Sequence, residues 1–212
     1  MLKISEIFFS IQGESTFSGL PCIFVRLAGC NLRCNYCDTS YSYEEDYSEI
    51  SIEEVINEIK KFDSKRVEIT GGEPLLQEET ALLIDKLLEN DYTVLLETNG
   101  SIGLDNLDSK VIKIVDIKTP GSGCEGSFRM ENIAFLNADD EIKFVLMDRK
   151  DFEWAKEMIE KHNLKCKANI LLSPVSGKLD PRDLSEWILQ EGLDVRLQLQ
   201  LHKIIWGDER GR

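Results

Sequence analysis

The sequence predicts an α/β fold in which mostly parallel strands form an open, partial (β/α)8-type barrel. Short apolar, β-branched runs alternate along the chain with stretches whose apolar residues recur at helical spacing. Strands that alternate with helices pair in parallel through right-handed crossovers. A complete barrel of this type needs roughly 250 residues. Because this chain has 212 residues, we expect a single domain over 1–212 that does not close.

The first half of the chain supplies four of the predicted strands and two helices. Residues 22–29, CIFVRLAG, form an apolar run that ends in glycine, as a strand before a loop does. Ser51 and Glu54 form a capping box that predicts a helix start. The apolar positions of that helix share one face, namely Ile52, Val55, Ile56 and Ile59. The other elements are a helix and three strands, at 78–89, 66–74, 92–100 and 110–118.

The second half continues the alternation with three strands and two helices. Asp151 is the predicted N-cap of the first helix. Asp180 is the predicted N-cap of the second, with Pro181 at its first helical position. The first of these helices is expected to bury Phe152, Ala155 and Ile159. The strands are predicted over 141–147, 167–175 and 195–201.

Unusual segments stand at the carboxyl ends of the predicted strands. They read GCNLRCNYCDT, TGGEP, ETNG, DIKTPGSG and SPVSG. In parallel α/β folds the loops at these strand ends line the binding site. We therefore expect the five segments to converge on one cavity.

Composition disfavours several classes of function. The chain carries 39 acidic and 25 basic residues, a formal charge of −14, which disfavours binding to a nucleic-acid backbone. No apolar run approaches the roughly 20 residues of a membrane span. Glu6 interrupts the apolar N-terminal stretch, and no signal cleavage site follows it. We expect a cytoplasmic protein with no nucleic-acid or membrane partner, in which most acidic residues lie on solvated helix faces.

Three of the six cysteines, Cys30, Cys34 and Cys37, are crowded into eight residues. A cytosolic chain keeps ordinary thiols reduced, so this crowding favours a metal over disulfides. A structural zinc site takes four ligands, and the two histidines of this chain are forty residues apart. Three thiolates suit a four-iron cluster with one open corner, with zinc or a disulfide as the lesser alternative. The other cysteines are expected to be small buried residues without chemistry, namely Cys22, Cys124 and Cys166.

The three crowded cysteines, together with GGEP at 71–74, resemble the motifs of the radical S-adenosylmethionine (SAM) enzymes. The resemblance implies a partial barrel of the radical SAM type and a [4Fe-4S] cluster. It further implies that the open iron binds the amino and carboxylate groups of SAM, whose reductive cleavage yields a 5′-deoxyadenosyl radical. Two adjacent glycines let the backbone approach such a ligand closely. The positions implied to contact SAM are Asp38, Gly72, Glu73, Asp116, Lys118, Ser173, Pro174, Val175 and Ser176.

Further segments narrow the resemblance. They include IQGES at 11–15, FVRLAGCNLRCNYCDT at 24–39, ETNG at 97–100 and LQLHKIIWG at 199–207. With the loops above, they are similar from end to end to the 7-carboxy-7-deazaguanine synthase family. That family converts 6-carboxy-5,6,7,8-tetrahydropterin to 7-carboxy-7-deazaguanine with release of ammonia, on the route to queuosine and archaeosine. Because the family often has Ser-Pro-Lys within DIKTPGSG, Asp116 is a less direct match than Lys118.

The resemblance also implies substrate and metal contacts. Arg26 would form a bidentate pair with the substrate carboxylate, a geometry that lysine cannot reproduce. Thr39 would bind Mg²⁺ with substrate oxygens and water, which are the ligands that Mg²⁺ prefers. A threonine here also suits a helix cap or a turn. The implied substrate contacts are Ile11, Gln12, Gly13, Glu14, Arg26, Thr70, His202 and Arg212.

The implied partners are a small pterin substrate, a reductant such as flavodoxin or ferredoxin, and a second copy of the chain in a homodimer. No side chain is predicted to be catalytic. Two other classes stay open from sequence. A radical SAM activase, which oxidises a glycine of a partner protein, shares the cysteine spacing but needs neither Arg26 nor Mg²⁺. A non-enzymatic zinc-binding domain would not cleave SAM, and the shortage of histidine disfavours it.

Overall fold

The computed structural model describes residues 1–207 and 209–211. Within them, the strands form one nine-stranded sheet in the order β3-β1-β2-β4-β5-β6-β7-β8-β9. From β2 to β9 every neighbouring pair is parallel, whereas β1 is antiparallel to β2 and β3. The predicted α/β fold with mostly parallel strands is confirmed. The strands are β1 (Leu2–Ile11), β2 (Pro21–Leu27), β3 (Ser48–Ile50), β4 (Arg66–Gly71), β5 (Thr93–Thr98), β6 (Ile112–Asp116), β7 (Glu141–Leu146), β8 (Asn169–Pro174) and β9 (Arg196–Leu197).

The two antiparallel strands are not among the predicted elements. In β1, Lys3 and Glu6 interrupt the apolar pattern, and the pairing with β2 shifts register between Ile4 and Glu6. Glu6 stands opposite Arg26 in the ladder and accepts a hydrogen bond from its guanidinium. β3 has only three residues, too few to show a period of two. Glu6, the charged residue that obscures β1 in the sequence, therefore pairs with Arg26 on the neighbouring strand of the sheet.

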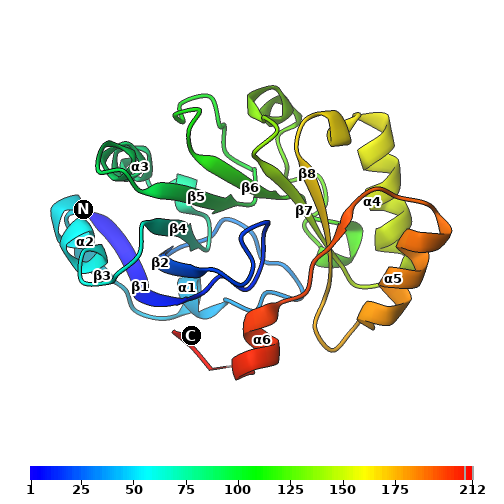
Figure 1. Cartoon of the computed structure of the whole chain (residues 1–212), viewed down its shortest axis with the longest axis horizontal. Helices are drawn as coiled ribbons and strands as arrows, with labels where there is room; N and C mark the ends of the chain where they lie inside the picture. The colour runs from blue at the N-terminus through cyan, green and yellow to red at the C-terminus, as the bar shows by residue number, and fades with distance from the viewer. Residues whose placement is uncertain (208, 212) are drawn as a thin grey trace.

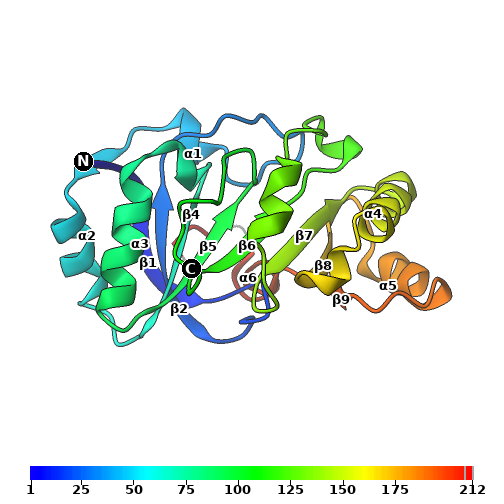
Figure 2. The ribbon, with the colours of Figure 1, turned by 90° about the horizontal axis from the view of Figure 1, so that it is seen from above.

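Helices cover the outside of the sheet. Figure 1 shows the strands as an arc, with four helices on its outer side: α2 (Ile52–Ile59), α3 (Glu79–Glu89), α4 (Arg149–Lys161) and α5 (Pro181–Gln190). Val55 and Leu83 belong to a core that packs the first two helices against β2 and β4, and Phe152 and Leu184 belong to a second core over β7 and β8. Figure 2 shows these two helix pairs on opposite flanks. The shorter pieces are α1 (Tyr41–Glu44), α6 (Leu201–Trp206) and 3-10 turns at Pro74–Leu76, Pro120–Ser122, Met130–Phe135 and Leu164–Cys166.

Two helix starts agree with the sequence prediction. The capping box of Ser51 and Glu54 is present in α2, with both reciprocal hydrogen bonds. Asp180 caps α5 by accepting the Arg182 N–H, and Pro181 is the first helical residue. Local side-chain chemistry therefore decides these two boundaries.

The predicted cap at Asp151 is wrong. Asp148 is the N-cap of α4, and its side chain accepts the N–H groups of Lys150 and Asp151. Asp151 lies in the first turn, is buried, and accepts the Gly121 and Met147 N–H groups at 2.8 and 2.9 Å. Its carboxylate joins two loops at the carboxyl ends of the strands, a role that only tertiary contact reveals.

The last predicted strand, 195–201, is mostly wrong. Only Arg196–Leu197 pairs with β8, and Leu201–Trp206 form α6. The chain leaves the sheet here because the Leu201 N–H donates to the Gly13 carbonyl oxygen at 2.9 Å. As a result, α6 lies at the open side of the arc, between its two ends (Figure 1).

The sheet does not close into a barrel, since β3 and β9 are its edge strands. This agrees with the predicted open, partial barrel. In the part of the chain that the structure describes, no helix is long and apolar enough to cross a membrane.

Candidate active site

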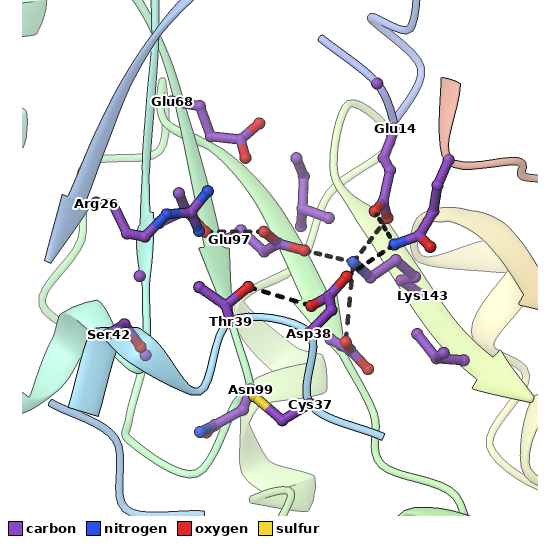
Figure 3. Close-up of a pocket in the computed structure, with 18 of the residues that line it drawn as sticks. Glu14, Arg26, Cys37, Asp38, Thr39, Ser42, Glu68, Glu97, Asn99 and Lys143 are labelled. Atoms are coloured by element: carbon purple, nitrogen blue, oxygen red, sulfur yellow. Dashed lines mark hydrogen bonds and ion pairs between the residues drawn. The ribbon is translucent and has the colours of Figure 1, made fainter. Parts of the chain in front are cut away.

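One cavity of about 280 Å³ lies at the centre of the arc and gathers most of the predicted site residues. Glu73, Ser173 and Pro174 do not line it, and Arg212 lies outside the described residues. Figure 3 shows the charged side of this cavity. The predicted residues that line it are Ile11, Gln12, Gly13, Glu14, Arg26, Cys30, Cys34, Cys37, Asp38, Thr39, Thr70, Gly72, Asp116, Lys118, Val175, Ser176 and His202.

The cysteine loop follows β2 directly. Gly29 has a φ of 93°, which turns the chain out of the strand and favours glycine at that position. The loop is docked from its far side, where the Asn35 N–H donates to the Ser122 carbonyl at 2.8 Å and the Tyr36 hydroxyl donates to the Val145 carbonyl at 3.1 Å. Backbone contacts with two other strand ends therefore hold the loop over the cavity.

The donor set of this loop fits an iron–sulfur cluster better than zinc. All three thiols line the cavity, and no histidine accompanies them there except His202 on α6. Among the described residues, no three His, Cys, Asp or Glu side chains form a ready-made metal site. Because metal binding is coupled to folding of the ligand segment, binding would draw these thiols together. Cys30, Cys34 and Cys37 would hold the cluster.

Burial favours the protonated thiol form of Cys30 and Cys34 in the absence of a metal. Desolvation raises the pKa of Cys34 to about 12, against the opposing field of Lys118. Desolvation also raises the pKa of Cys30, although the Leu32 N–H donates to its Sγ at 3.4 Å. Because metals bind thiolates, cluster loading releases protons here.

The prediction that three scattered cysteines are buried holds only for Cys22. Cys124 is half-buried and Cys166 is exposed. The Cys124 side chain hydrogen-bonds to that of Cys34, so it stands beside the cysteine loop. The expectation fails because both residues follow turns rather than strands, where no apolar pattern reports burial.

The Gly-Gly-Glu segment, residues 71–73, packs against the start of the cysteine loop. A Cβ on Gly72 would lie 2.7 Å from the Cys30 Cβ, and closer still to the Gly29 carbonyl, so only glycine fits. Glu73 is fully buried, and its carboxylate accepts the Thr98 hydroxyl at 2.8 Å and the Asn99 N–H at 2.7 Å. Burial raises the pKa of Glu73 against these bonds. Its carboxylate thus joins the ends of β4 and β5 instead of lining the cavity.

Arg26 points into the cavity from β2 (Figure 3). Its Nε donates to Glu6 Oε1 at 2.7 Å, and the Tyr41 hydroxyl donates to the same oxygen at 2.8 Å. The side chain of Arg26 is 16% exposed. Glu6 and Tyr41 were not predicted, and they hold the guanidinium in one orientation.

A buried charge network, which the sequence interpretation misses, forms the inner wall of the cavity. Lys143 on β7 lies 3.0 Å from Glu14, in closer contact with Glu97, and 3.8 Å from Asp116. Lys118 pairs with Asp116 at 2.7 Å. In the sequence, the only indication of this network is a charged residue within a mostly apolar strand. Lys143 stands in EIKFVL, and Glu97 stands in TVLLET.

Two glutamates on neighbouring strands of this wall have pKa values shifted in opposite directions. Burial, and then the charge of Glu97, raise the pKa of Glu68 well above its usual range, and Gln12 donates a hydrogen bond to Glu68. Burial also acts to raise the pKa of Glu97, but Lys143 outweighs it and lowers that pKa to about 2. Burial therefore favours the protonated form of Glu68, and Lys143 favours the ionised form of Glu97.

Asp38 and Thr39 face this wall from the cysteine loop. Thr39 is not a helix cap, because Ser40 is the N-cap of α1; its hydroxyl donates to Asp38 Oδ1 at 3.1 Å. Lys203 lies 3.1 Å from Asp38 Oδ2 and, against the effect of burial, helps to lower the pKa of Asp38 to about 2. Ser42, close by, has a buried hydroxyl without a partner among the described residues.

The fold and this site define a radical SAM enzyme. Residues 25–188 match the family model described as the radical SAM superfamily. The structure of Streptococcus suis SuiB bound to S-adenosylmethionine shares the fold, with a TM-score of 0.56 and 13% identity over 80% of this chain and 48% of that chain. As a member of this superfamily, the protein uses a [4Fe-4S] cluster and SAM.

Other comparisons are more specific. Relatives named 7-carboxy-7-deazaguanine synthase in Koribacter versatilis and Chlorobaculum tepidum are 46% and 47% identical, over 98% and 99% of this chain and 98% and 97% of their own. The crystal structure of QueE from Escherichia coli matches with a TM-score of 0.79 and 25% identity, covering 95% of this chain and 94% of that chain. The chain belongs to the 7-carboxy-7-deazaguanine synthase family.

Proposed function

We propose that the protein converts 6-carboxy-5,6,7,8-tetrahydropterin to 7-carboxy-7-deazaguanine with release of ammonia, in the synthesis of 7-deazapurines such as queuosine and archaeosine. The observation that carries the proposal is one cavity that joins three cysteines at one end to Arg26, Gln12 and Glu14 at the other. A single domain over 1–212 suffices for this reaction.

The cysteine end is the cofactor end. When bound, the cluster and SAM supply an electron and a means of hydrogen-atom abstraction from the substrate. Gly72 lets the end of β4 pack closely against Gly29 and Cys30, and the Glu73 carboxylate holds that segment in place through the Asn99 N–H. The other side chains proposed to face SAM are Asp38, Asp116, Lys118, Ser173, Pro174, Val175 and Ser176, of which the buried Ser173 and Pro174 would support rather than touch it.

The opposite end binds the substrate. Arg26 meets the substrate carboxylate, since Glu6 and Tyr41 already orient its planar fork. Gln12 and Glu14 face the donor and acceptor edge of the pterin, and the Gln12 side chain is held in place by its hydrogen bond to Glu68. Ile11, Gly13, Thr70 and His202 complete the pocket, and Gly13 lies directly against His202.

Thr39 is the proposed Mg²⁺ ligand. Its hydroxyl bonds to a carboxylate that is ionised at neutral pH, so the two oxygens suit a hard cation that retains several waters. Thr39→Ala should reduce the stimulation of turnover by Mg²⁺ about 10-fold, measured as product formation against MgCl₂ concentration. Ser40→Ala is the matched control, because Ser40 does not line the cavity. An unchanged Mg²⁺ response in Thr39→Ala would remove Thr39 from the metal site.

An external one-electron carrier such as flavodoxin or ferredoxin is the proposed reductant. The cysteine loop reaches the surface, where Asn31, Arg33 and Cys37 are exposed. A carrier docked on this loop would therefore approach the cluster closely. We further propose a cytoplasmic homodimer, which sedimentation of the loaded protein would test.

The decisive test is an anaerobic incubation of the cluster-loaded protein with reductant, Mg²⁺, SAM and 6-carboxytetrahydropterin, followed by mass spectrometry. Several molecules of 7-carboxy-7-deazaguanine per SAM support the proposal. If 5′-deoxyadenosine alone accumulates, the substrate assignment fails and an activase acting on a partner protein becomes the better hypothesis.

A further inference from the structure

Among the described residues, Lys143 is the one basic residue whose side chain contacts carboxylates from both ends of the cavity. Its ammonium lies 3.0 Å from Glu14 and closer to Glu97 at the substrate end, and 3.8 Å from Asp116 at the cofactor end. The lysine side chain is only 6% exposed. Figure 3 shows these contacts converging on its nitrogen.

Each carboxylate that Lys143 contacts holds a further group of the cavity. Glu97 accepts the Thr70 hydroxyl at 2.9 Å, and Asp116 pairs with Lys118 at 2.7 Å. Glu14 accepts the Gln200 amide at 2.9 Å, and that amide also donates to Asp38 at 3.2 Å. Three chains of contacts thus start at one ammonium: one ends at Thr70 at the substrate end, and two end at Lys118 and Asp38 at the cofactor end.

Asp116 also has an oxygen free for a ligand. Its Oδ2 takes part in both lysine contacts, whereas Oδ1 is buried and has no hydrogen-bond partner among the described residues. A buried acceptor of this kind is costly unless a bound group satisfies it. A ligand that donates to Oδ1 would therefore act on the same carboxylate that Lys143 contacts from the other side.

We propose that Lys143 is a positioning residue that couples the binding of SAM to the binding of the pterin substrate. This inference rests on the proposed function. Substrate that engages Glu14 and Thr70 fixes the carboxylates around the ammonium, and the fixed ammonium then holds Asp116 in the orientation that receives SAM. The coupling is reciprocal, because SAM in place would equally favour the substrate-bound arrangement.

Lys113 is a matched comparison on the neighbouring strand. It is also buried, at 3% exposed, and lies 3.0 Å from Asp140. Because Ile114 lines the cavity, Lys113 points to the opposite face of β6 and lies outside the cavity. Both lysines form a buried ion pair, but only Lys143 joins two binding regions.

The test measures the dissociation constant of SAM for the cluster-loaded protein by equilibrium dialysis, without reductant, in the absence and presence of saturating 6-carboxytetrahydropterin. The ratio of the two constants is the coupling factor, and values of roughly 5 to 150 are usual for coupled sites. We expect a ratio of at least about 5 in the unmodified protein and about 1 in Lys143→Met. Lys113→Met should retain the unmodified ratio, and Lys143→Gln replaces Lys143→Met if the latter does not fold.

Separate outcomes distinguish the two proposals. If a folded Lys143 variant retains the full ratio, or if the unmodified protein shows a ratio of 1 while it forms product, the inference is overturned and the proposed function stands. Loss of the fold in both Lys143 variants would make the residue structural and overturn the inference as well. If the unmodified protein binds SAM but forms no 7-carboxy-7-deazaguanine, the proposed function fails instead.

Discussion

The two ends of the cavity are built in different ways. The three thiols of the cysteine end come from one contiguous loop, 30–39, and lie within eight residues of sequence. The substrate end draws Arg26, Glu97 and Lys143 from three different strands and Glu14 from the loop after β1. Short-range spacing therefore sets the chemistry of the first end, and sheet topology sets the second.

The two ends also differ in what holds them. Hydrogen bonds from the Asn35 N–H and the Tyr36 hydroxyl to backbone carbonyls of Ser122 and Val145 dock the cysteine loop. Buried ion pairs around Lys143 hold the other end, where removal of one partner leaves an uncompensated charge. We therefore expect mutations at the cysteine end to abolish the cofactor and mutations at the substrate end to alter affinity.

The largest expected effect lies at the cysteine end. Cys34→Ala should abolish both the brown iron–sulfur absorbance and product formation, because two remaining thiols cannot hold the cluster. Iron content and anaerobic absorbance spectra measure the loss of the cluster. Cys166→Ala, which removes an exposed thiol, is the control. A Cys34→Ala protein that still cleaves SAM would contradict the assignment of this end.

Gly72→Ala tests the contact between the cysteine loop and β4. The added Cβ would lie 2.7 Å from the Cys30 Cβ, so backbone must shift at a cost of about 1–3 kcal/mol. We expect lower stability in denaturant and weaker retention of iron. Gly103→Ala is a control, since its Cβ meets only the mobile end of the Asp105 side chain at 2.5 Å. Equal stability of the two variants would show that the loop and β4 move independently.

At the substrate end, Arg26→Lys should weaken substrate binding about 10- to 100-fold, because lysine loses one of two charge-assisted hydrogen bonds. SAM cleavage without substrate should persist at the unmodified rate. Steady-state kinetics and 5′-deoxyadenosine release measure the two effects. Arg66→Lys, outside the cavity, provides the comparison. An unchanged Michaelis constant in Arg26→Lys would mean that another group binds the carboxylate.

The smallest effect concerns Glu68 and pH. Its pKa in the folded protein is raised by burial, so the folded state retains a proton that the unfolded chain releases above about pH 4.3. The stability associated with that proton is lost as pH rises through the folded pKa. Between pH 5 and pH 8, the free energy of unfolding of Glu68→Gln should therefore rise by on the order of 1 kcal/mol relative to that of the unmodified protein.

Urea unfolding at the two pH values measures this gain. Glu186→Gln, on the exposed surface of α5, should show no comparable change. Glu97 should behave in the opposite way, because its pKa is lowered to about 2, and its stabilisation is lost as pH falls from about 4.5 toward 2. A pH-independent difference for Glu68→Gln would mean that Glu68 is ionised in the fold.

Several boundaries could be predicted from sequence because their causes are local. The capping box at Ser51 and the Asp180-Pro181 start depend on residues within one helical turn. The parallel strands are visible because both of their faces are buried and apolar. β1 and α6 escaped prediction because a partner distant in sequence decides each, Arg26 for Glu6 and Gly13 for Leu201.

The sequence by itself determined the class of chemistry: three cysteines at fixed short spacing, a double glycine after a strand and an arginine before the cysteine loop need no long-range information to be recognised. The tertiary structure alone decided the environment of the substrate. Glu97, Glu68 and Lys143 look like ordinary charged positions in apolar strands, and their meaning appears only when β4, β5 and β7 bring them to one buried wall. The physical reason is that the strength and sign of an electrostatic interaction depend on distance and burial, and a linear sequence specifies neither for residues on different strands.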